Sequence, residues 1–181
     1  MKSKMWPPMR CLLDKVAARF IVQGLTKVAE QHVPTVNESI ALALFARAAS
    51  SAYELFIAPP TANVLHHLTQ YPHYAPIIRL FLQRVEVIQP TRYFKRWARR
   101  LRDYGFTRED GAMLALATFS TNQSRSIIGM NYLATFDQPM INQWNAQQDA
   151  ISLRLQAMQR DLQPPYSYAS LPRVLRPDYL P

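Results

Sequence analysis

Cysteine, glycine and acidic residues are scarce in this chain, and each scarcity narrows its possible functions. The 181 residues include one cysteine, Cys11, which excludes an internal disulfide and any zinc site that needs two thiolates from this chain. Cys11 lies inside an apolar run, so we expect it to be a small buried side chain. With 4 glycines and no glycine-rich motif, a loop that cradles phosphate through backbone amides is not expected.

The sequence also lacks a continuous apolar run of about 18 residues, so we expect no membrane-spanning segment and no membrane partner. The basic start is interrupted by Arg10, Asp14 and Lys15 before any apolar run develops, which is not typical of a signal peptide. With a single cysteine, the expected location is the reducing cytoplasm.

Basic residues exceed acidic residues, with 21 lysines and arginines against 12 aspartates and glutamates and a formal net charge of +9. An excess of this size favours a polyanionic partner, most often nucleic acid. Hydrophobic residues make up 49% and charged residues 18%, which is typical of a folded domain.

Short apolar runs alternate with amphipathic stretches along the chain, which predicts an α/β domain with a short, parallel-rich sheet flanked by helices in three layers. The expected strands are 9–13, 55–58, 85–88 and 132–136, with a further strand-like stretch at 126–128. The expected helices are 15–30, 35 to about 50–53, 61–68, 74–84, 91–104, 107–119 and 138–162.

Residues 1–163 are expected to form this domain, and residues 164–181 a proline-rich tail. The tail either lies against the core through Tyr166, Tyr168, Leu171 and Val174 or stays disordered.

Local signals fix several helix ends. Thr35 and Glu38 form a capping box, in which each side chain accepts a hydrogen bond from the other residue's backbone amide. Gly105 is expected in the left-handed conformation that ends a helix, and Thr107 is expected to cap the next one.

Three aspartates stand at the ends of apolar runs. Asp14 follows Arg10-Cys11-Leu12-Leu13, Asp137 follows Leu133-Ala134-Thr135-Phe136, and Asp110 opens the run from Gly111 to Ala117. Parallel strands deliver such residues to one edge of a sheet, where ligands bind. Clustered carboxylates repel one another unless a cation is present, and their hard oxygens favour Mg²⁺ or Mn²⁺.

Each aspartate also has a simpler role. Asp14 and Asp137 stand where they could cap the helices that follow, and Thr107 with Asp110 resembles a helix start. All three capping roles are compatible with one another, so this alternative stays open.

The order of these segments resembles the PIN-domain nucleases. The segments that carry the resemblance are Arg10–Asp14, Phe56–Leu65, Phe106–Ala117 and Leu133–Asp137. The resemblance implies a PIN-like domain and a metal-dependent endoribonuclease that cuts RNA phosphodiester bonds with Mg²⁺ or Mn²⁺. Asp14, Asp110 and Asp137 would hold the ion, Thr135 would orient Asp137 or a metal-bound water, and Asn63 would be a weak fourth ligand.

The chain departs from the family at Asn63, which stands where a glutamate is usual and brings no charge to a metal. Glu54 is expected at the wrong end of its strand to replace it. The alternative function is therefore a catalytically degenerate PIN-like module that binds nucleic acid or another protein. The sequence leaves open a homodimer and a protein inhibitor or other protein partner.

Six cations fall within eleven residues of the expected helix 91–104: Arg92, Lys95, Arg96, Arg99, Arg100 and Arg102. They lie opposite the apolar stripe of Phe94, Trp97 and Leu101. Arginine binds phosphate in a planar fork, so this face is the candidate contact for an RNA backbone. The alternative is a solvated face on a basic protein.

Overall fold

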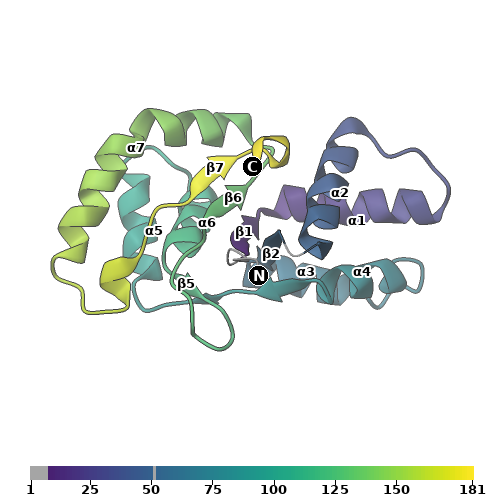
Figure 1. Cartoon of the computed structure of the whole chain (residues 1–181), viewed down its shortest axis with the longest axis horizontal. Coiled ribbons are helices and arrows are strands. Elements are labelled where there is room, and N and C mark those ends of the chain that lie inside the picture. The colour runs from purple at the N-terminus through teal and green to yellow at the C-terminus, as the bar shows by residue number, and fades with distance from the viewer. Residues whose placement is uncertain (1–7, 51) are drawn as a thin grey trace, which may run out of the picture.

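A five-stranded sheet, in which every pair of neighbouring strands is parallel, forms the middle layer of the computed structural model (Figure 1). The structure describes residues 8–50 and 52–181. Across the sheet the strands are β3 (Val85–Val87), β2 (Tyr53–Ile57), β1 (Met9–Leu13), β6 (Tyr132–Ala134) and β7 (Arg173–Leu175). Two shorter strands, β4 (Gln89–Pro90) and β5 (Ser120–Thr121), pair antiparallel.

Helices cover both faces of the sheet, which confirms the predicted three-layer α/β class. The helices of one layer are α1 (Lys15–Ala29), α2 (Val36–Ala49), α3 (Pro59–Leu68) and α4 (Ala75–Leu82). Those of the other layer are α5 (Phe94–Arg102), α6 (Arg108–Thr118) and α7 (Gln138–Gln159). Figure 1 shows α5 and α7 grouped on one side of the sheet and α1 and α2 on the other.

Successive strand residues face opposite layers, so two hydrophobic cores form. Leu12, Phe56 and Leu133 pack under α5, α6 and α7, whereas Leu13 and Ile57 pack under the α1–α4 layer. A parallel sheet covered on both faces needs apolar residues at nearly every strand position, which explains why these strands appear in the sequence as unbroken apolar runs. Cys11 is fully buried in the second core, as predicted.

The predicted helix ends at Thr35 and Gly105 are confirmed. The Glu38 backbone amide donates to the Thr35 hydroxyl at 3.4 Å, and the Thr35 amide donates to the Glu38 carboxylate at 2.6 Å. Gly105 has a φ of +85°, the left-handed conformation that glycine adopts without strain.

The predicted strand at 126–128 is wrong. This stretch belongs to a loop held by Asn122, whose side-chain oxygen accepts a hydrogen bond from the Ser126 backbone amide at 2.9 Å. Ile127 and Ile128 are apolar because they pack against the core beneath the loop, not because they pair in the sheet. Local side-chain hydrogen bonds compete with strand pairing in this way.

The tail from residue 164 lies against the core and completes the sheet. Its strand β7 pairs with β6, with Val174 opposite Leu133, and Val174 is 1% exposed. Tyr166 and Leu171 pack on the same core, whereas Tyr168 is exposed. The residues after 163 therefore share their sheet and core with the preceding domain.

Candidate functional site

Strands β1 and β6 flank the point where the order of the sheet reverses. The chain runs from β1 to β2 and β3 in one direction and then returns to place β6 on the other side of β1. After β1 it enters α1 in one layer, and after β6 it enters α7 in the other. Open α/β sheets bind ligands beside the carboxyl ends of such a pair of strands. We call this place the carboxyl edge; Asp14, Thr135 and Asp137 follow the two strands there.

Asp14 is almost buried at the carboxyl edge, with 8% of its surface exposed. One carboxylate oxygen accepts a hydrogen bond from the Ala17 backbone amide at 2.5 Å, which caps α1. The other accepts from the Thr135 hydroxyl at 2.5 Å. Burial raises the pKa of Asp14, because a charged carboxylate loses its hydration there. The hydrogen bonds from Ala17 and Thr135 lower this pKa, and the nearby charge of Asp137 raises it, so that the pKa remains above its usual value.

Thr135 connects the two strand ends. It is fully buried, and its hydroxyl donates to Asp14 while accepting from the Asp137 backbone amide at 3.0 Å. Asp137 itself is exposed and caps α7, because its carboxylate accepts from the Met140 amide at 2.9 Å. Asp14 and Asp137 therefore lie close enough to influence each other, and each also caps its own helix.

Asp110 belongs to the start of α6. Its backbone amide donates to the Thr107 hydroxyl at 3.1 Å, and that hydroxyl donates to the Asp110 carboxylate at 2.6 Å. Lys15 lies between this turn and the carboxyl edge. Its ammonium pairs with Glu109, which raises the pKa of Lys15, and the charges of Asp14 and Asp110 raise it further. The chain thus supplies its own cation among these acids.

Sequence reasoning missed the role of Lys15. The residue directly follows Asp14, so the signal was present, but its partner Glu109 is 94 residues away. Pairing over that distance depends on the starts of α1 and α6, which belong to opposite helix layers, coming together at this edge of the sheet, and no local pattern contains that.

The remaining predicted ligand, Asn63, is exposed on α3, the helix that follows β2. Glu54 lies near the amino end of β2, as expected, and so on the opposite edge of the sheet from Asp14. Within residues 8–50 and 52–181, no three acidic, histidine or cysteine side chains gather at a spacing that would hold a metal ion. Mg²⁺ can be held by one or two carboxylates when water or phosphate oxygens complete its shell, and Asp14 and Asp137 are the two carboxylates that follow β1 and β6 at the carboxyl edge.

The second candidate region is the face of α5 that points to solvent. We call Arg92, Lys95, Arg96, Arg99, Arg100 and Arg102 the α5 basic surface. Five of these side chains are exposed and Arg100 is half-buried, whereas Trp97 and Leu101 on the opposite face are fully buried. The helix begins at Phe94, three residues later than predicted, but the predicted division into two faces is confirmed.

Most charges of the α5 basic surface lack an acidic partner. Arg100 reaches Asp103 at 4.0 Å, and in the described part of the chain no other member lies within 4.0 Å of a carboxylate. The Arg92 guanidinium instead stacks over Tyr93 and Tyr166, at 4.7 and 5.1 Å from their ring centres. Five of the six cations therefore have no carboxylate partner within the described residues.

Close packing of α6 on α5 joins the two regions. A Cβ atom at position 111 would lie 3.2 Å from the Ala98 carbonyl oxygen and 3.7 Å from the Arg102 side chain. Because Gly111 has no Cβ, the two helices can approach this closely. Arg102, at one end of the α5 basic surface, thus lies beside the turn of α6 that carries Asp110.

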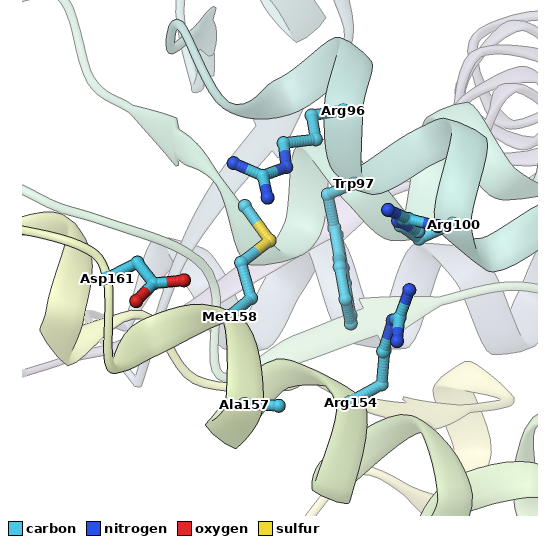
Figure 2. A pocket seen from close by; sticks show the side chains of 7 residues that line it. All are labelled: Arg96, Trp97, Arg100, Arg154, Ala157, Met158 and Asp161. Carbon is cyan, nitrogen blue, oxygen red and sulfur yellow. The ribbon is translucent and has the colours of Figure 1, made fainter.

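A pocket of about 220 Å³ opens between α5 and α7 (Figure 2). It is lined from α5 by Arg96, Trp97 and Arg100, and from α7 and its end by Arg154, Ala157, Met158 and Asp161. Sequence reasoning missed Arg154. Its spacing from Met158 places both on one side of α7, but only the packed structure shows that this side faces α5.

No match was found for this chain among protein-family models, curated proteins or solved structures. The PIN-domain resemblance therefore rests on the residues of this sequence. None of the helices in the described ranges is long and apolar enough to cross a membrane.

The raised pKa of Asp14 predicts a pH-dependent stability. Because the folded chain holds this proton at pH values where the unfolded chain has lost it, the stability from this group is fully present below about pH 4 and falls as pH rises through the raised pKa. Asparagine keeps the cap but does not titrate. We therefore expect the free energy of unfolding of Asp14→Asn, minus that of the wild type, to increase as the pH rises above about 4.

Urea unfolding followed by circular dichroism at several pH values would measure this difference. Asp149→Asn, at an exposed position on α7, is the control for the loss of one negative charge. A difference between Asp14→Asn and the wild type that does not change with pH would contradict the assigned environment of Asp14.

Proposed function

We propose that this chain binds single-stranded RNA through the α5 basic surface. The observation that supports the proposal is a row of exposed cations on one helix face, five of them without a carboxylate within 4.0 Å in the described residues. The net charge of +9 favours the approach of any polyanion. The choice of RNA over DNA rests on the resemblance to the PIN-domain nucleases.

The length of the surface sets the expected size of the contact. Helix α5 has 9 residues and is therefore about 14 Å long. A helix of this length can lie beside only a few consecutive phosphates of one strand. Each phosphate contact on a single strand contributes about −0.7 to the slope when the logarithm of the association constant is plotted against the logarithm of the salt concentration.

Arg99→Gln is expected to weaken binding of every RNA sequence by a similar factor and to reduce the size of this salt slope by about 0.7, because one phosphate contact is lost. Fluorescence anisotropy with a labelled single-stranded RNA at several KCl concentrations would measure both quantities. Arg19→Gln, at an exposed position on α1 in the other helix layer, is the matched control. Equal losses in the two variants would mean that net charge alone, not the α5 basic surface, attracts RNA.

A second candidate function is Mg²⁺- or Mn²⁺-dependent cleavage of the bound RNA at the carboxyl edge. It is favoured by the position of Asp14 and Asp137 at the reversal of the sheet, where their charges affect each other. These two carboxylates would hold the ion, which would supply an activated water and neutralise charge on the phosphoryl group. Thr135 would hold Asp14 in place, and Asp110 with Asn63 would have to approach to add further ligands.

Asp137→Asn is expected to reduce RNA cleavage in Mn²⁺ by at least tenfold while leaving RNA affinity within about twofold, since it removes a metal ligand outside the α5 basic surface. Gel analysis of an end-labelled RNA, with and without a chelator, would measure cleavage. Asp149→Asn is again the control. Cleavage that survives chelation, or that is unchanged in Asp137→Asn, would exclude this site; no cleavage by the wild type would leave a binding module without catalysis.

A further inference from the structure

The pocket between α5 and α7 extends the basic surface onto a second helix. Figure 2 shows the Trp97 side chain between Arg96 and Arg100 on α5, with Arg154 extending toward it from α7. Asp161 lies beyond Met158 on the side of Arg96. Side chains from two helices thus line this pocket, whereas a second hollow of about 510 Å³ is lined from the α5 segment alone, by Arg92, Lys95, Arg96, Arg99 and Arg100.

Positive charge exceeds negative charge around this pocket. Three guanidiniums and one carboxylate line it, so its formal charge is three minus one, or +2. Among the described residues, neither Arg96 nor Arg154 has a carboxylate within 4.0 Å, and Arg100 reaches Asp103 only at that limit. Like charges around one pocket that have no acidic partner repel one another, and an anion with several oxygens reduces this repulsion.

Apolar side chains lie among these charges. Trp97 is fully buried and Met158 is 8% exposed, so the guanidiniums lie over low-dielectric packing, which strengthens their attraction for an anion. The volume of about 220 Å³ corresponds to about seven water molecules in the liquid. This is room for a phosphate group and part of the sugar attached to it.

We infer that this pocket binds the terminal phosphate monoester of an RNA strand, so that the chain prefers RNA with a phosphorylated end. This inference rests on the proposed RNA binding. A monoester carries a charge of about −1.5 to −2 at pH 7, which matches the charge of the pocket, and it presents three free oxygens. An internal phosphodiester carries one charge and is flanked by two sugars, so fewer of the three arginines reach it.

The test compares three RNA oligonucleotides of one sequence with an internal fluorophore: one with a 5′-phosphate, one with a 3′-phosphate, and one with hydroxyls at both ends. One phosphorylated strand is expected to bind the wild type at least fivefold more tightly than the hydroxyl strand, and this result also identifies the end that is recognised. Arg154→Gln is expected to abolish the preference while changing affinity for the hydroxyl strand by less than about threefold. Arg154 is exposed, so the variant keeps its fold.

Arg99→Gln is the matched control, because Arg99 belongs to the α5 basic surface but does not line this pocket. It is expected to weaken all three strands by the same factor and to keep the preference. Equal wild-type affinity for all three strands, or a preference that survives in Arg154→Gln, would overturn the pocket assignment while RNA binding stands. A failure of all three strands to bind would overturn both proposals.

Discussion

Burial of Trp97 and Leu101 beneath α5 is the constraint on which the basic surface depends. Both side chains are fully buried, and the Trp97 ring meets Phe119 edge-on with ring centres 6.1 Å apart. Removing a buried tryptophan costs about 3–5 kcal/mol, whereas two cations 4 Å apart in water repel by about 1 kcal/mol. The apolar face therefore fixes the orientation of α5, and the cations must face solvent together.

Close contact with α6 then fixes the position of this surface. Gly111 permits the Ala98 carbonyl to approach, and α7 closes over the other side of α5 near Trp97 and Met158. The six cations consequently become one face with a pocket at its α7 side. Burial of the hydrophobic core outweighs the repulsion between these like charges, and a bound polyanion would reduce that repulsion.

The carboxyl edge differs from the α5 basic surface, because its charged side chains already have hydrogen-bond or ion-pair partners within the chain. Asp14 and Asp137 each accept a backbone hydrogen bond at a helix start, and Thr135 bridges the two residues. Lys15 pairs with Glu109, and the charges of Asp14 and Asp110 raise its pKa further. The edge is thus built as three capped helix starts, and a divalent ion there would compete with Lys15 for the same acids.

Features encoded locally were predictable from the sequence, and features that depend on distant packing were not. The Thr35–Glu38 capping box, the turn at Gly105 and the two faces of α5 each follow from residues within one or two helical turns. Strand β7 has three residues in a proline-spaced segment. It forms because it pairs with β6, where Val174 lies opposite Leu133, 41 positions earlier. The presence of Arg154 at the same pocket as Arg96 and the pairing of Lys15 with Glu109 likewise required the packed layers.

Ultraviolet crosslinking to a single-stranded RNA, followed by mass spectrometry of the labelled peptides, tests most directly whether the α5 face receives RNA. Tyr93 and Tyr166 lie beside Arg92 and would react with bases held there. Tyr71 and Tyr74, exposed near the start of α4 in the other layer, provide an internal comparison. Labelling concentrated in peptides that contain Tyr93 or Tyr166 is the expected result; labelling of Tyr71 and Tyr74 without these two would contradict it.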